Sequence, residues 1–274
     1  MVCQRQVIPA AGSGSDGRRQ TPSRRPANQF MTHATIVLVF LLLQVSLSCA
    51  AADTLEEFSA YYSATTNGIR GTAERHLVQL TQHSYRLSVS LEAKLGGLKI
   101  GALEQASEFG FSGGQIKPLT YSYQVSGVSS AVETVVFNWD SMLALSANEE
   151  QSWSVAINNN TLDELSYQLA LALDIAVPGE TIYSYETVDG DALDKSSFRV
   201  LGEEIISTPL GDFRCVKLER NRAASSGRTT TIWLALDWSY LLARIEQTSA
   251  FGLDITLDLT DALVAGQRVS GLTD

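Results

Sequence analysis

Apolar and polar residues alternate along much of this chain, and this period of two constrains the fold more than any other feature. Residues 85–92 (YRLSVSLE) and residues 253–260 (LDITLDLT) show it most clearly. Successive side chains of a β-strand point to opposite faces of a sheet, so each stretch presents one apolar face and one polar face. The pattern is typical of antiparallel strands that bury one face.

Similar stretches of five to eight residues recur along the rest of the chain. They predict further strands at Phe58–Thr65, Leu119–Val125, Thr134–Trp139, Trp153–Ile157, Thr181–Val188, Ser197–Leu201, Phe213–Arg220, Thr229–Leu236 and Leu241–Thr248. Turn sequences separate several of them. Residues 67–68 (NG) and 189–190 (DG) are strong hairpin signals, and residues 208–211 (TPLG) suit a type I turn.

One helix interrupts the strands. Thr161 and Glu164 have the spacing of a capping box, in which the threonine hydroxyl and the glutamate carboxylate satisfy each other's backbone amides. The following residues place an apolar stripe on one face, and residues 178–179 (PG) end the helix. The expected helix therefore covers residues 162–176, and its stripe comprises Leu162, Leu165, Leu169 and Ala172, with Leu173 and Ala176 beside it.

Together these elements predict a mainly β fold. We expect a large, twisted antiparallel sheet or incomplete β-barrel of about ten strands, with one main helix packed against its concave face. The glycine-rich stretches at residues 95–97 and 112–114 resemble loops and are too short to separate domains. Residues 53–274 are therefore expected to form a single β-rich domain.

The first 52 residues differ in character from the rest. Residues 1–30 are polar and predict a disordered segment, whereas residues 34–45 are an uncharged apolar run followed by small residues. This is the layout of a signal peptide, with cleavage after Ala52, and it predicts a periplasmic protein whose mature form has no membrane span. Retention of residues 34–52 as an inner-membrane anchor and lipidation at Cys49 are the alternatives, and translation could start at Met1 or at Met31.

The charge balance excludes one large class of partners. The chain has 20 Lys and Arg residues, 30 Asp and Glu residues, and a formal net charge of -10. The first 52 residues hold five of the arginines and one acidic residue, so residues 53–274 have a net charge of -14. Such an acidic domain is a poor partner for nucleic acid or for an anionic membrane surface.

Residues that could perform chemistry are sparse. His76 and His83 are the only histidines in residues 53–274, and neither lies near a second histidine or a cysteine at ligand spacing. No nucleophile elbow, zinc-protease, P-loop or dinucleotide-binding motif is present. Residues 189–194 (DGDALD) lack the glutamate of a calcium loop, and Cys215 lies in an expected strand. We therefore predict no catalytic residue, no metal site and no cofactor.

Two groups of residues are candidates for binding. Leucines of the expected helix and tyrosines of three strands could form the wall of an apolar ligand site in a partial barrel. These candidates are Leu162, Leu165, Leu169, Leu173, Tyr121, Tyr123, Tyr183 and Tyr185. A basic patch at Arg214, Lys217 and Arg220 could instead contact an anionic head group or an acidic partner, although a solvated hairpin would explain these charges equally well.

The order of several motifs resembles the proteobacterial envelope family of unknown function DUF3108, over most of residues 55–265. The resemblance rests on residues 58–62 (FSAYY), 68–71 (GIRG), 161–169 (TLDELSYQL), 208–213 (TPLGDF), 217–220 (KLER), 233–235 (WLA) and 240–245 (YLLARI). The positions that carry it, all of unknown role, are Gly68, Gly71, Asp163, Ser166, Thr208, Pro209, Gly211, Trp233 and Arg244.

Two positions depart from the family pattern. Glu164 stands where the family usually has a basic residue, and Leu242 stands where it has a proline. The family implies no activity, so it implies no catalytic residue. A weaker similarity of the closing strands to periplasmic lipoprotein carriers implies an incomplete barrel that holds acyl chains around a helix.

Three hypotheses for the function follow. The first is an exported, non-enzymatic envelope protein that binds an apolar or acyl-chain ligand in its partial barrel. The second is a structural or assembly factor whose barrel is filled by its own side chains and which contacts another envelope protein. The third is an enzyme that uses a pair of carboxylates, although no particular pair stands out in the sequence.

Overall fold

Strands dominate the structure, a computed structural model that describes residues 54–66, 69–177, 179–221, 229–248 and 254–273. The strands before the helix are β1 (Phe58–Thr66), β2 (Ile69–Thr81), β3 (Ser84–Leu95), β4 (Leu98–Ser112), β5 (Gln115–Gly127), β6 (Ala131–Asn138), β7 (Leu143–Asn148), β8 (Ser152–Ala156) and β9 (Thr161–Leu162). Helix α2 (Ser166–Ile175) is followed by β10 (Ile182–Asp189), β11 (Ala192–Thr208), β12 (Gly211–Asn221), β13 (Thr229–Ala235), β14 (Leu241–Thr248), β15 (Asp254–Val264) and β16 (Gln267–Arg268).

All sixteen strands belong to one sheet. The order is β8-β7-β6-β5-β4-β3-β2-β1-β15-β14-β13-β12-β11-β10-β9, with β16 paired to β15 off this path. Neighbouring strands are antiparallel except β9 and β10, which pair in parallel. The sheet therefore consists of two meanders, β1 to β8 and β10 to β15, which are joined in the middle of this order by the pairing of β1 with β15.

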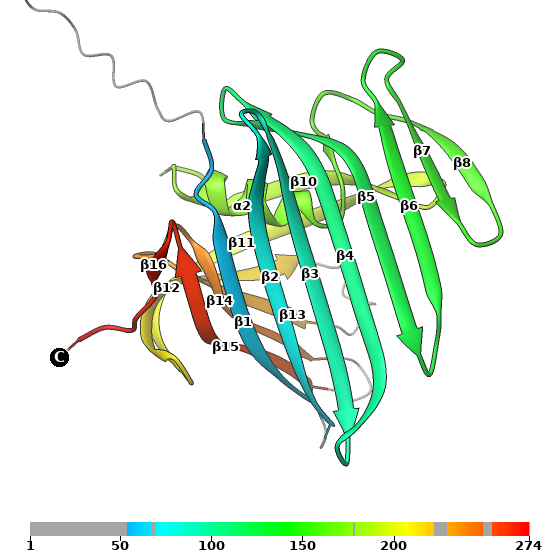
Figure 1. Ribbon diagram of the computed structural model, residues 1–274. Helices are drawn as coiled ribbons and strands as arrows, with labels where there is room; N and C mark the ends of the chain where they lie inside the picture. The colour runs from blue at the N-terminus through cyan, green and yellow to red at the C-terminus, as the bar shows by residue number, and fades with distance from the viewer. Residues whose placement is uncertain (1–53, 67–68, 178, 222–228, 249–253, 274) are drawn as a thin grey trace, which may run out of the picture. The chain divides into compact units, whose positions relative to one another are not determined.

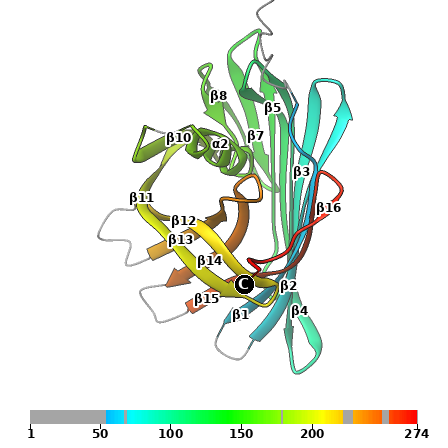
Figure 2. The same ribbon diagram turned by 90° about the vertical axis from the view of Figure 1, so that its left-hand side faces the viewer.

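The sheet curls without closing. Strands β1 to β5 form a long, twisted wall, and β10 to β15 bend away from it towards helix α2 (Figures 1 and 2). Helix α2 lies on the concave side, in the space that the curl encloses (Figure 2). The mainly β, barrel-like fold with one helix on the concave face is therefore confirmed.

The prediction of about ten strands was too low. Strands β2, β4, β7, β9 and β16 were not recognised in the sequence. In β2 and β4 many residues on both faces are partly or fully exposed, so the alternation of apolar and polar side chains is weak. Strand β9 has two residues, which is too short for any periodicity to appear.

The turns follow the expected chemistry where the structure describes them. Asp189 pairs with Ala192, and Gly190 closes this hairpin with a φ of 57°. Thr208 pairs with Gly211 across the second predicted turn. Residues 96–97 and 113–114, expected to be loops, are tight turns between β3, β4 and β5. The predicted turn at residues 67–68 and all predictions for residues 1–52 lie outside the described residues.

The predicted start of the helix was wrong. Thr161 lies in β9, and its Oγ1 accepts a hydrogen bond from the Asn158 amide at 3.0 Å, not from the Glu164 amide. Asp163 supplies the cap instead: its Oδ1 accepts from the Ser166 amide at 2.7 Å, and its own amide donates to Ser166 Oγ at 3.0 Å. The capping box is therefore two residues further along the chain than predicted.

This shift also changes the face that the helix buries. The helix has 10 residues, and Ser166, Tyr167 and Leu171 are its buried side chains. Leu169 and Leu173, part of the predicted stripe, are only partly buried. Tyr167 stacks on Phe198 of β11 and Tyr185 of β10, with ring centroids 5.6 Å and 6.2 Å apart. Aromatic packing against these two strands decides which face of the helix is covered.

Within the described residues, no helix is long and apolar enough to cross a membrane.

Candidate functional site

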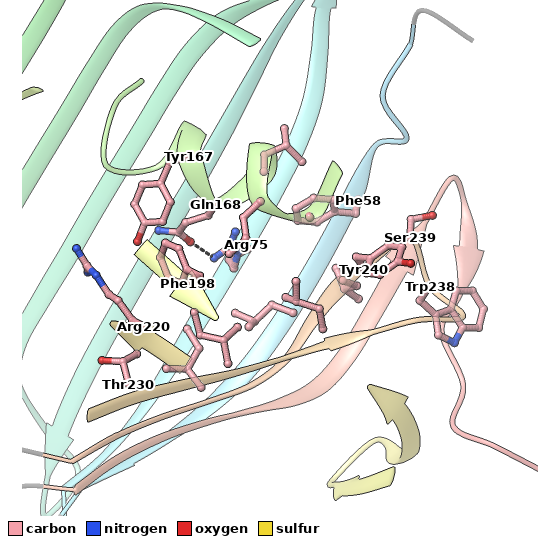
Figure 3. Close-up of a pocket in the computed structure, with 18 of the residues that line it drawn as sticks. Phe58, Arg75, Tyr167, Gln168, Phe198, Arg220, Thr230, Trp238, Ser239 and Tyr240 are labelled. Atoms are coloured by element: carbon pink, nitrogen blue, oxygen red, sulfur yellow. Dashed lines mark hydrogen bonds between the residues drawn. The ribbon is translucent and has the colours of Figure 1, made fainter. Parts of the chain in front are cut away.

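A pocket of about 230 Å³ lies between helix α2 and the curled strands. The helix contributes Leu169, Leu171 and Ala172, and β13 and β14 contribute Ile232, Leu234 and Ile245. Phe58, Tyr240 and Trp238 line it towards the start of β1 and the β13–β14 turn (Figure 3). The lining is therefore mainly aliphatic and aromatic, as in sites that hold apolar molecules.

Two arginines enter this apolar lining from different strands. Arg75 belongs to β2, and Arg220 belongs to β12. Figure 3 shows Arg75 beside Gln168 of the helix, and Arg220 beyond Phe198 and Tyr167. The few other polar residues of the lining, among them Thr230 and Gln247, carry no charge.

Arg75 has unusual surroundings for a charged side chain. Its Nη1 donates to Gln168 Oε1 at 2.7 Å. None of the ion pairs among the described residues involves it. Burial lowers the pKa of its guanidinium, and the nearby hydroxyls of Tyr62 and Tyr167 oppose this. An arginine still remains protonated, so a positive charge faces a largely apolar pocket.

The guanidinium of Arg220 has more interactions with the protein than that of Arg75. Its Nη2 donates to Ser196 Oγ at 2.5 Å, and its guanidinium lies 6.0 Å from the centre of the Phe198 ring. Burial raises the pKa of Glu164, and the charge of Arg220 opposes that rise. Arg220 therefore has a hydrogen bond to Ser196, a contact with the Phe198 ring and an electrostatic interaction with the Glu164 carboxylate.

Register explains why the curled strands expose apolar side chains to the pocket. Arg220 pairs with Phe198, Leu218 pairs with Ile232, and Val216 pairs with Leu234. Side chains of directly paired residues lie on the same face of a sheet, so this row faces the concave side. The alternate residues of β12, including Cys215 and Lys217, face the other way.

The helix that closes the pocket is held by polar contacts at both ends. At its start, Asp163 Oδ2 accepts from Ser107 Oγ of β4 at 2.6 Å, and Glu164 Oε1 accepts from Thr187 Oγ1 of β10 at 2.5 Å. At its end, Asp174 Oδ2 accepts from the Tyr185 hydroxyl at 2.7 Å. These contacts connect the helix to both halves of the sheet.

The predicted ligand-wall residues do not gather in one place. Leu169 lines the pocket. Leu162 and Tyr185 line a separate, more polar hollow beside β9 and β10, and Tyr123 lines a shallow one over β3 to β6. Four others line none of these three hollows: Leu165, Leu173, Tyr121 and Tyr183.

The three candidates for a basic patch also lie apart. Arg214 is exposed and pairs with Asp237 at 2.8 Å. Lys217 pairs with Glu204 at 3.1 Å and lies over the Trp233 ring. Only Arg220 points into the pocket. Sequence reasoning did not select Arg75, because strand β2 was not recognised and no pattern distinguished this arginine from its neighbours.

The family-motif residues have contacts that hold the sheet and its turns. Asp163 and Ser166 form the helix cap, and Thr208 Oγ1 accepts from the Leu210 amide within the turn that contains Pro209 and Gly211. A Cβ on Gly71 would lie 2.7 Å from the carbonyl oxygen of Glu92 on the next strand. Gly68 lies outside the described residues.

Trp233 and Arg244 occupy the outer face of the sheet. Trp233 Nε1 donates to Glu204 Oε1 at 2.5 Å. Arg244 Nε donates to Asp258 Oδ1 at 2.6 Å, and its Nη2 donates to the Ser207 carbonyl oxygen at 2.8 Å. These residues cross-link neighbouring strands away from the pocket.

The groups considered for catalysis or metal binding are dispersed. Cys215 is fully buried, and burial raises the pKa of its thiol to about 12. His76 Nδ1 lies 3.0 Å from Ser59 Oγ, and His83 is exposed in a turn. Across the described ranges, no three His, Cys, Asp or Glu side chains are placed to hold a metal ion.

Comparison with solved structures finds several matching chains. A β-barrel-like protein of the family DUF1849 from Brucella abortus matches with a TM-score of 0.51 and 9% identity, over 77% of this chain and 98% of that one. A protein with a YmcC-like fold from Bacteroides fragilis, named as a candidate exported protein, matches with a TM-score of 0.34 and 11% identity, over 77% and 97%. A protein from Parabacteroides distasonis, named as a candidate lipoprotein, matches with a TM-score of 0.31 and 11% identity, over 76% and 96%.

The similarity to the Brucella protein agrees with the barrel-like architecture, and at this identity it shows the fold alone. No curated protein matches the chain in sequence. A family model described as a protein of unknown function, DUF3108, matches residues 57–260. This match runs from β1 into β15 and includes every residue of the pocket lining except Val264, and the chain therefore belongs to the family DUF3108.

Proposed function

We propose that this protein is an exported, non-enzymatic envelope protein that binds an apolar or acyl-chain ligand in the pocket under helix α2. The observation that carries the proposal is the pocket itself: about 230 Å³ lined by aliphatic and aromatic side chains on the concave side of an unclosed sheet. The signal peptide predicted in residues 1–52 supports export.

Burial of apolar surface supplies the binding energy in this proposal. Each Å² of apolar surface removed from water contributes roughly 25 cal/mol. Leu169, Ala172 and Ile232 are only partly buried although they face the interior of the curl, so a ligand would cover surface that the fold leaves open.

The first test is a search for a ligand that accompanies the protein. The full chain is produced with export, purified from the periplasm without detergent, and its organic extract is examined by mass spectrometry. We expect a stoichiometric apolar molecule. An empty protein would contradict the proposal and would favour an assembly role, in which the protein contacts another envelope protein.

Variants connect retention of the ligand to this pocket. Leu169→Asp places a carboxylate in the lining, and Ala172→Phe fills part of the space. Both are expected to lower the bound ligand at least tenfold, roughly the effect of 1.4 kcal/mol. The matched control is Leu98→Asp, because Leu98 is 75% exposed at the start of β4 and does not line the pocket. Equal retention in all three variants would place the ligand elsewhere.

A further inference from the structure

Charged side chains in this domain normally find a partner of opposite sign. Five arginines of the described ranges form ion pairs with carboxylates: Arg86, Arg199, Arg214, Arg244 and Arg268. Residues 53–274 contain 29 acidic residues, so carboxylates are plentiful. Neither of the two arginines that line the pocket, Arg75 and Arg220, is in one of these ion pairs. The charge of Arg220 acts on the nearby Glu164, whereas among the described residues only tyrosine hydroxyls act on Arg75, which is partly buried.

The immediate neighbours of Arg75 leave room for an anion. Its hydrogen bond to Gln168 uses one of the five N–H donors of the guanidinium and a neutral acceptor. The groups that raise its pKa are the hydroxyls of Tyr62 and Tyr167, not carboxylates. The planar fork of a guanidinium matches a carboxylate, which can accept two parallel hydrogen bonds from it.

The shape and size of the pocket restrict the rest of the ligand. Its volume of about 230 Å³ lies below the roughly 300–1,000 Å³ of sites for drug-sized molecules. This volume suits one acyl chain and is too small for a lipid with two. Aliphatic side chains of α2, β13 and β14 line the space next to Arg75. An acyl chain would therefore contact apolar side chains while its charged head group contacts the guanidinium.

We infer that the ligand is an anionic single-chain amphiphile, a fatty carboxylate, whose head group pairs with Arg75 while its chain lies against α2, β13 and β14. Gln168 orients the guanidinium through its Oε1. The inference rests on the proposed function, since it specifies the ligand of the same pocket. Residues 53–274 are strongly acidic, so most of the domain repels an anion. The guanidinium of Arg75, which has no carboxylate partner among the described residues, would therefore favour an anionic head group in the pocket.

The test compares two probes that differ only in the charge of the head group, decanoate and decanamide. The full chain is stripped of bound lipid on a hydrophobic resin, and affinities are measured by isothermal titration calorimetry at neutral pH. We expect decanoate to bind at least about 30-fold more tightly than decanamide, the lower end for a buried hydrogen-bonded charge pair. Equal affinities would overturn the inference while the proposed function stands, and absence of binding by both probes would overturn both.

Variants assign the effect to one residue. Arg75→Gln is expected to reduce the affinity for decanoate to that for decanamide and to leave decanamide unchanged, whereas Arg75→Lys retains part of the difference. Arg199→Gln is the matched control, because Arg199 is exposed on β11 and pairs with Glu219. A preference for decanoate that survives in Arg75→Gln would show that another group binds the carboxylate. If Arg75→Gln does not fold, the comparison of the two probes on the unmodified chain still decides the inference.

Discussion

Asp163 is a single residue on which the position of the helix depends. Its side chain is fully buried and accepts hydrogen bonds from Ser107 Oγ and from the amides of Leu165 and Ser166. Burial raises the pKa of this carboxyl group, and the three donors oppose that rise. One carboxylate thus caps the helix and joins it to β4.

Replacement of Asp163 by alanine is expected to lower the free energy of unfolding by about 2–4 kcal/mol, since a helix cap is lost and buried donors are left unpaired. Urea unfolding followed by circular dichroism measures the loss. Asp191→Ala, at the exposed tip of the β10–β11 hairpin, is the control and should change stability by less than about 0.5 kcal/mol. A loss below about 1 kcal/mol for Asp163→Ala would show that the cap is not essential.

Gly71 illustrates the constraints that act on strands. It lies in β2 opposite Ala64 of β1 and Ala93 of β3. A Cβ there would lie 2.7 Å from the carbonyl oxygen of Glu92. This oxygen belongs to the backbone, so it cannot move away as a flexible side chain could. The glycine therefore allows two neighbouring strands to approach closely.

Gly71→Ala should lower the free energy of unfolding by about 1–3 kcal/mol, because the added methyl group forces the backbones apart. Gly101→Ala in β4 is a matched control: its Cβ would meet only the Ser126 carbonyl oxygen, at 3.4 Å. This control should be neutral or slightly stabilising, since alanine restricts the unfolded chain. Equal effects of both substitutions in thermal unfolding would count against the steric explanation.

The body that the structure describes is a curled sheet with helix α2 on its inside. The two meanders are joined where β1 pairs with β15, and the helix contacts β4 of one and β10 of the other through Ser107, Thr187 and Tyr185. A ligand under the helix would touch α2, β13 and β14 together. Binding should therefore stabilise the described body as a unit.

Saturation of the pocket should raise the melting temperature. A ligand at 100 times its Kd adds about 2.7 kcal/mol to the stability of the state that binds it. For a domain of this size that corresponds to about 5–10 °C. Differential scanning calorimetry with decanoate measures the shift, and Arg75→Gln should show a much smaller one at the same concentration. An unchanged melting temperature at a concentration that saturates the protein would contradict binding to the folded state.

Local rules explain which features could be predicted. Alternation in residues 253–260 and turn chemistry at residues 189–190 and 208–211 act within a few residues, and the structure contains the strand and both turns. The predicted capping box begins two residues too early. Thr161 lies in strand β9, and its hydroxyl oxygen accepts a hydrogen bond from the Asn158 amide instead of capping the helix. Competing local partners, not the wrong residue types, caused that error.

The candidate site depended on contacts that no local pattern reveals. Leu169 was selected from the sequence, whereas Arg75 and Ile232 reach the same pocket from strands that are about 160 residues apart in the chain. Alternation determines that a strand has an apolar face. It does not determine how far the sheet curls, which strands face the helix, or which arginines line the pocket.

The sequence by itself therefore determined the fold class, the acidic charge, the turns and the presence of one helix, since each depends on residue type and short spacing. Only the tertiary structure decided the order of the strands, the buried face of the helix and the pocket with Arg75. These features arise when distant strands pair in one register, and the free energy of that pairing depends on side chains that are far apart along the chain.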